Sequence, residues 1–149
     1  MYFQDDHFFN PVLDAGCYYI SLANLVEKHS GKPVDKTLVK NYALTEVLDG
    51  KAGNVDSDMT IENANGVLIK FGSPLRQKLY NGSVAFPADY ACQPGEFEIL
   101  QFQYVNVVSG TYRHFTLGDG TGKCEADPMS LGSNSVRLGK VISKRIFSV

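Results

Sequence analysis

With 149 residues, a hydrophobic fraction of 44% and a charged fraction of 20%, the chain has the size and composition of one globular domain. We therefore expect residues 1–149 to form a single domain. A net charge of -2 gives no electrostatic reason to bind nucleic acid or an anionic membrane. No apolar run approaches the roughly 20 residues of a membrane span, and the acidic N-terminus is unlike a secretory signal. These features predict a cytoplasmic protein with no nucleic-acid or membrane partner.

The first two predicted helices follow an aromatic and acidic lead-in. Residues 16–28 contain no proline and no further glycine after Gly16 and are apolar on most faces, and Gly31 and Pro33 predict the end of this helix. The stretch "VDKTLVKNYALTEVLDG" has apolar residues at helical spacing and predicts a second helix. Asp35 is its expected N-cap residue, because a carboxylate accepts hydrogen bonds from the free N–H groups of a first helical turn.

A third helix is predicted over residues 60–72, "TIENANGVLIKFG". Thr60 is the expected N-cap residue and Gly72 the expected end of this helix. Gly66 lies inside it and is unfavourable there, because glycine loses more backbone entropy than other residues on entering a helix.

The second half of the sequence predicts antiparallel strands. "LRQKLY" (75–80) is a short candidate, and "EFEILQFQYVNVVSG" (96–110) and "TYRHFTLGDG" (111–120) are expected to form a hairpin across Ser109 and Gly110. Two more candidates come last, "KCEAD" (123–127) and "KVISKRIFSV" (140–149). Helices followed by antiparallel strands predict an α+β domain in which the two parts pack as layers.

The three cysteines, Cys17, Cys92 and Cys124, include no CxxC pair and are odd in number, which is typical of a reduced compartment. Cys17 lies where a loop becomes a helix. A helix N-terminus favours the reactive thiolate, although a free cysteine at such a position is also commonly a small buried residue. Cys92 and Cys124 are expected to be structural.

His114 is the histidine best placed to assist Cys17. His7 lies in the lead-in, and His29 lies at the far end of the Cys17 helix, about 18 Å away at 1.5 Å per residue. If the strands on either side of "GDGTG" pair, Asp127 returns close to His114 and can orient its imidazole. Asp127 precedes a proline, so a simple turn role remains an alternative.

Other polar residues are given more ordinary roles. Asp119, in "GDG", is expected to form a turn, and Arg145 near the C-terminus is expected on a solvated strand face, with pairing to a carboxylate or a position in a cleft as alternatives. A metal site made of Cys17, His114, Cys124 and Asp127 lacks the short paired spacings of zinc sites. No cofactor is therefore expected.

Three segments, "DAGCYYISL", "RHFTLGDG" and "EADP", resemble the motifs of papain-like cysteine peptidases, in particular the compact domains that remove leader peptides from bacteriocins. The chain is also similar to a small group of uncharacterised bacterial and phage proteins with an "FNP…GCY" opening and an S-x-R ending, here Ser143 to Arg145. The resemblance implies a papain-like fold, with N-terminal helices packed on a C-terminal antiparallel sheet.

The implied function is hydrolysis of an amide bond by a Cys-His-Asp triad. In this hypothesis Cys17 attacks the carbonyl, His114 takes the thiol proton and later protonates the leaving amine, and Asp127 orients His114. The glutamine that papain-like enzymes place six residues before the cysteine is replaced here by Pro11. The carboxamide of Asn10 is the expected substitute, and would form the oxyanion hole with the Cys17 backbone N–H.

Two alternatives accompany this reading. The substrate is either a peptide or the peptide part of bacterial cell wall, as for phage lysins of the same fold, in which case the protein is phage-associated. A catalytically silent papain-like module with a binding or structural role, for example in a phage particle, is the second alternative, and the replacement of the glutamine favours it.

Overall fold

A computed structural model describes residues 1–3, 6, 16–48, 53–55, 60–106, 110–129 and 139–149. Within these residues the chain forms three helices, α1 (Cys17–Ser30), α2 (Lys36–Leu48) and α3 (Ala64–Lys70). Six strands follow: β1 (Arg76–Gln77), β2 (Phe86–Pro87), β3 (Phe97–Asn106), β4 (Gly110–Gly118), β5 (Cys124–Ala126) and β6 (Lys140–Ser148). The predicted α+β class, with helices first and strands afterwards, is confirmed.

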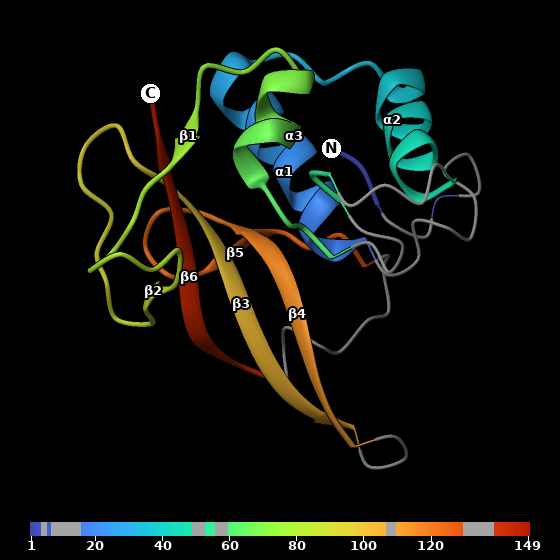
Figure 1. Cartoon of the computed structure of the whole chain (residues 1–149). Helices are drawn as coiled ribbons and strands as arrows, with labels where there is room; N and C mark the ends of the chain where they lie inside the picture. The colour runs from blue at the N-terminus through green and yellow to red at the C-terminus, as the bar shows by residue number, and fades with distance from the viewer. Residues whose placement is uncertain (4–5, 7–15, 49–52, 56–59, 107–109, 130–138) are drawn as a thin grey trace.

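The strands form one antiparallel sheet in the order β1-β6-β3-β4-β5, and β2 pairs with β6 beside this path. Figure 1 shows the helices gathered on one side of the sheet, with α1 against the strands and α2 farthest from them. The predicted hairpin is present as the β3–β4 ladder, in which Phe102 lies opposite His114. The predicted pairing across "GDGTG" is also present, with Leu117 of β4 opposite Ala126 of β5.

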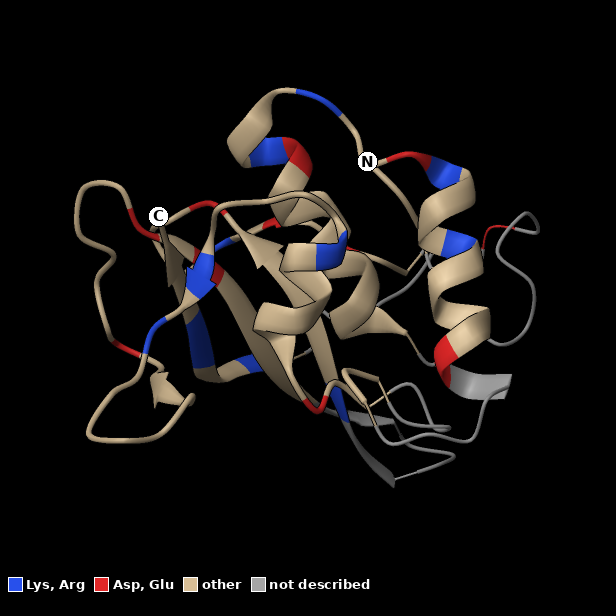
Figure 2. Cartoon of the chain, turned by 45° about the horizontal axis from the view of Figure 1, so that its top comes forward, with Lys and Arg blue, Asp and Glu red and all other residues tan. Residues whose placement is uncertain are grey.

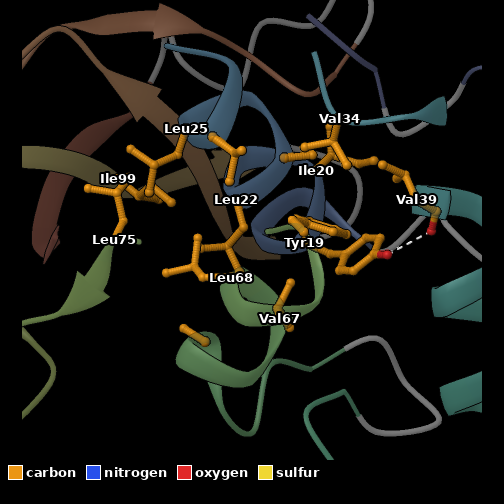
Figure 3. Close-up of a cluster of buried hydrophobic side chains, with 14 of the residues drawn as sticks. Tyr19, Ile20, Leu22, Leu25, Val34, Val39, Val67, Leu68, Leu75 and Ile99 are labelled. Atoms are coloured by element: carbon orange, nitrogen blue, oxygen red, sulfur yellow. Dashed lines mark hydrogen bonds between the residues drawn. The ribbon is translucent and has the colours of Figure 1, made fainter. Parts of the chain in front are cut away.

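The main core lies between α1 and one face of the sheet. Leu22 and Leu25 of α1 are completely buried, as are Ile99 of β3 and Leu117 of β4. Leu68 of α3 packs into the same cluster, which Figure 3 shows between the helices and the strands. Burial of each such side chain is worth about 1.5–3 kcal/mol, so this layer accounts for the attachment of α1 to the sheet.

Local hydrogen bonds fix the end of α1 and the start of α2 where the sequence predicts them. Gly31 follows α1 with a positive φ of 77°, and its N–H donates to the Glu27 carbonyl at 2.8 Å. The Asp35 carboxylate accepts from the Leu38 N–H at 2.9 Å and caps α2. The buried Tyr19 hydroxyl then joins the two helices by donating to the Val39 carbonyl at 2.7 Å (Figure 3).

The third helix is shorter than predicted, and Thr60 is not its N-cap. Asn63 caps α3 by accepting from the Gly66 N–H at 3.2 Å, while Ile61 pairs with Val55 in an isolated bridge. A Cβ atom on Gly66 would lie 1.9 Å from the Asn54 side-chain oxygen. Gly66 is therefore present because the segment around Asn54 approaches α3 closely, which is a tertiary requirement rather than a helical one.

Two short strands depart from the sequence prediction. Of the predicted 75–80 strand, Arg76 and Gln77 form the ladder with β6, and the Lys78 N–H donates to the Ile146 carbonyl at 2.7 Å. The strand ends there, because Tyr80 turns back to exchange hydrogen bonds with Ser83. Strand β2 was not predicted, since it contains Pro87 and has only two residues. It lies at the margin of the sheet, where the missing N–H of a proline is tolerated.

Charged residues of both signs are interspersed over the described helices and strands (Figure 2). None of the helices in the described part of the chain is long and apolar enough to cross a membrane.

Candidate active site

Cys17 is the first residue of α1. Gly16 occupies the N-cap position, and because glycine has no side chain, the N-cap residue accepts no hydrogen bond from the first turn through a side chain. The first N–H groups of an α-helix have no partner within the helix and carry the positive end of its dipole. The Cys17 thiol is half-buried and free of any disulfide. Its position therefore favours negative charge while leaving the sulfur accessible.

His114 and Asp127 are brought together by the pairing of β4 with β5. His114 is 4% exposed, and its Nε2 lies 2.6 Å from the Asp127 Oδ1. Asp127 Oδ1 also accepts from the Met129 N–H at 2.9 Å, which holds the carboxylate in place. The imidazole Nε2 is therefore engaged by a fixed carboxylate, and Nδ1 remains for another partner.

Cys17 is the neighbour of His114 on its other side. Burial disfavours a charged imidazole, but a hydrogen bond to Asp127 and a hydrogen bond to Cys17, reinforced by the charges of both residues, raise the pKa of His114 to about 9. Cys17 of α1 thus lies close enough to His114, 97 residues later in the chain, to raise the pKa of its imidazole. His114 is held largely as an imidazolium at neutral pH.

The carboxylates of Asp119 and Glu98 hold the loop between β4 and β5 by hydrogen bonds. Asp119 forms the turn as predicted, its Oδ1 accepting from the N–H and hydroxyl of Thr121, both at 2.7 Å. On the other side, Glu98 Oε2 of β3 accepts from the N–H groups of Gly120 and Gly122 at 3.0 and 2.8 Å. These contacts fix the path of the chain that leads into β5 and on to Asp127.

The remaining two cysteines lie in surroundings that keep them protonated. Burial, followed by the charge of Glu98, raises the pKa of Cys92 to about 12, and its thiol donates to the Glu98 carboxylate at 3.6 Å. Burial also raises the pKa of Cys124. A raised thiol pKa lowers nucleophilicity at neutral pH, which agrees with the structural role expected for both.

A cavity of about 330 Å³ opens beside Cys17. Its walls come from the N-terminal turn of α1, the segment before α3, β1, β4 and β6, and include Tyr18, Ile61, Gln77, Phe115 and Arg145. This volume lies at the lower end of the ~300–1,000 Å³ typical of ligand sites, enough for a small part of a larger molecule.

Arg145 occupies a position that the sequence offered only as an alternative to a solvated strand face. It is half-buried on a wall of this cavity, so the expected solvated face is wrong. Alternation along β6 carries the missing signal, because Arg145 shares a strand face with the fully buried Phe147, two residues later. An arginine at an inward-facing position of a strand indicates a polar cavity. Composition alone does not give this indication, because it carries no information on strand faces.

Two other expectations concern the completeness of the site. Asn10, the predicted oxyanion donor, lies outside the described residues, as does Pro11. In the described part of the chain, no group of three or more His, Cys, Asp or Glu side chains has an arrangement that could hold a metal ion.

Comparison of the chain with protein-family models, with curated proteins and with solved structures finds no match. The chemistry available at Cys17 and in the adjoining cavity must therefore be argued from their geometry.

Proposed function

We propose that this protein is a thiol hydrolase that cleaves an amide bond in a peptide, with Cys17 as nucleophile, His114 as general base and acid, and Asp127 as the residue that positions His114. The observation that carries the proposal is the chain of contacts from Cys17 through His114 to Asp127, where the imidazole lies 2.6 Å from a fixed carboxylate. Nucleophilic catalysis by cysteine requires this combination of a thiol, an imidazole and an orienting group.

The reaction begins from an ion pair in which the thiol proton of Cys17 already resides on His114. The Cys17 thiolate attacks the substrate carbonyl, and the imidazolium gives its proton to the departing amine, leaving a thioester on Cys17. The neutral imidazole then takes a proton from a water molecule that attacks the thioester, which releases the acid and restores the ion pair. The Cys17 backbone N–H at the start of α1, together with the Asn10 carboxamide, would stabilise the oxyanion in both steps.

A papain-like relationship forms part of the same proposal. It is supported by α1 beginning at the cysteine, by its packing against an antiparallel sheet, and by the histidine on the neighbouring strand β4. The peptide substrate, whether an ordinary peptide or the peptide part of a cell wall, belongs to the proposal as well. The silent-module alternative predicts a thiol at Cys17 with ordinary reactivity, so reactivity is the property to measure.

The test is the pH dependence of Cys17 alkylation by iodoacetamide in a Cys92→Ser/Cys124→Ser background. We expect Cys17 to react readily below pH 7, because an adjacent imidazolium stabilises a thiolate. In His114→Ala the midpoint of the pH profile should move up toward the value of ~8.5 for a free cysteine. His29→Ala is the matched control, since His29 packs on Phe97 at the other end of α1 and should leave the profile unchanged.

A Cys17 that reacts no faster than a free cysteine, or that reacts only after unfolding, would contradict the proposal and favour the silent module. If the reactivity is as expected, a fluorogenic peptide library should reveal a hydrolysed substrate, and Cys17→Ala should abolish its cleavage.

A further inference from the structure

The cavity beside Cys17 contains a cationic group, Arg145, that has no anionic partner among the residues that the structure describes. Arg145 lines this cavity together with Cys17, and no aspartate or glutamate in the described part of the chain forms an ion pair with it. Burial lowers the pKa of Arg145, which records the cost of keeping a guanidinium partly out of water. A half-buried cation without a protein counter-ion is uncommon, because charges away from water are usually paired.

The Arg145 side chain is also held in a fixed orientation. Its Nη1 donates to the Ser143 Oγ at 3.0 Å and to the Lys144 carbonyl at 3.3 Å. Its guanidinium carbon lies 5.6 Å from the centre of the Phe115 ring, which in turn packs on Tyr18 at 4.5 Å between ring centres. Within the described residues no hydrogen bond uses Nε or Nη2 of Arg145, so part of its five-donor fork is available to a ligand.

The rest of the cavity wall is largely uncharged. Tyr18, whose pKa is raised by burial, stays neutral and accepts a hydrogen bond from the Gln77 Nε2 at 3.1 Å. Ile61 and Phe115 supply apolar surface. Among the described wall residues, Glu62 is the acidic one; it is exposed and does not pair with Arg145. The cavity therefore combines an apolar surface with one pre-oriented cation.

We propose that this cavity is the substrate-recognition pocket, and that Arg145 binds a carboxylate of the substrate beside an apolar group, close to the bond that Cys17 attacks. The proposal rests on the proposed function for the role of Cys17, and adds the class of substrate: peptides with a carboxylate next to the scissile amide. A planar guanidinium binds a carboxylate through two parallel hydrogen bonds, which gives orientation as well as affinity. The carboxylate belongs either to a free C-terminus or to an acidic side chain.

Matched bromoacetyl probes test the proposal directly. In each reaction the Cys17 sulfur forms a bond to the probe's methylene carbon, the carbon–bromine bond breaks, bromide leaves, and any thiol proton passes to His114. The acidic probes are bromoacetyl-leucine and the longer bromoacetyl-glycyl-leucine, each compared with its neutral leucinamide twin. Bromoacetyl-glutamic acid α-amide carries its carboxylate on the side chain, has a blocked C-terminus, and is compared with neutral bromoacetyl-glutamine α-amide. Rates are measured by intact mass spectrometry in the Cys92→Ser/Cys124→Ser background.

We expect at least one acidic probe to modify Cys17 about tenfold faster than its neutral counterpart, which corresponds to one partly buried ion pair. In Arg145→Gln this preference, taken as the ratio of the acidic to the neutral rate, should fall to within about twofold, whatever the variant's absolute rate with uncharged iodoacetamide. Glu62→Gln is the matched control: it removes the other charge of the cavity and should preserve or increase the preference. A preference for the leucine probes indicates a C-terminal carboxylate, and a preference for the glutamic acid probe an acidic side chain.

Equal rates for every acidic and neutral pair in the wild-type chain would overturn the proposal without recourse to any variant. A preference that persists in Arg145→Gln, with an unchanged melting temperature, would also overturn it and would assign the attraction to the His114 imidazolium. The proposed function fails separately, through a slow absolute rate with iodoacetamide, whereas the carboxylate pocket fails through the ratio of acidic to neutral rates.

Discussion

At the scale of single residues, the pKa of His114 is set by influences that act in opposite directions. Its burial alone would make the imidazole neutral, whereas the Asp127 carboxylate and the Cys17 sulfur make it cationic. The balance of these influences places the pKa of His114 at about 9. The protonation state of this one side chain therefore reports on both of its neighbours.

We predict that the imidazole of His114 titrates with a midpoint near pH 9 by NMR, and that Asp127→Asn and Cys17→Ala each lower the midpoint. In the double variant, burial is the main influence left, and the pKa should fall below the ordinary value of about 6.5. The Met129 N–H can still donate to an asparagine oxygen, so the loop should stay in place. Loss of the signal in His114→Gln assigns it, and a midpoint insensitive to both single variants would refute the contacts described.

At the scale of elements, the turn between β4 and β5 depends on a buried ion pair on the neighbouring strands. Glu98 of β3 and Lys144 of β6 are 1% and 3% exposed, and their charged atoms are 3.0 Å apart. Lys144 also donates to the Tyr90 carbonyl at 2.8 Å, while Glu98 accepts from the turn. This pair links the centre of the sheet to the loop that delivers Asp127.

Lys144→Met is expected to lower the free energy of unfolding by about 3–5 kcal/mol, because it leaves the Glu98 carboxylate buried without a cation. Adding Glu98→Gln to the Lys144→Met variant should recover part of this lost free energy, because burying a neutral amide costs less than burying an unpaired carboxylate. Glu125→Gln is the matched control, as it breaks the partly exposed pair with Lys28 near the same turn and should cost ~1 kcal/mol or less. Urea unfolding measures all three, and equal losses at the buried and exposed pairs would contradict the role given to Glu98.

At the scale of the whole molecule, the site joins both layers of the fold. Cys17 belongs to the helical layer and His114 to the sheet, and α1 is held on β3 and β4 by the core around Leu22 and Leu117. The contact between the thiol and the imidazole therefore exists only while the layers are packed together. Protonation of the site and stability of the fold must then be linked.

We predict that the protein loses stability as the pH rises from 6.5 to above 9. The folded-state pKa of His114 is higher than its ordinary value of 6.5, so its stabilising contribution is complete below pH 6.5 and is lost as the pH rises through about 9. The shift corresponds to at most about 3 kcal/mol. Urea unfolding at pH 6 and pH 9.5 should show a larger loss of unfolding free energy for wild type than for His114→Gln. The loss that remains in the variant comes from groups that both proteins share, such as Cys92 and Cys124, whose pKa values are raised by burial. Parallel losses would exclude this linkage.

How far prediction from sequence succeeds depends on how far apart the interacting residues lie. The cap at Gly31, the cap at Asp35 and the alternation of β3 are local patterns, and each was predicted. The juxtaposition of His114 with Asp127 was predicted too, because a short turn leaves little choice in how the two strands pair. The start of α3 was predicted wrongly, because the alternatives Thr60 and Asn63 are both good caps and the neighbouring Val55 decides between them.

By itself, the sequence determined the order of the helices and of every strand except β2, the pairing of β4 with β3 and with β5, and the three residues proposed for catalysis. These follow from periodicity, turn chemistry and the small number of histidines. Only the tertiary structure decided that Gly66 accommodates Asn54, that Glu98 holds the turn, and that Arg145 lines a cavity with Cys17. These contacts join residues far apart in the chain, and their energies depend on burial, which exists only once the layers have packed.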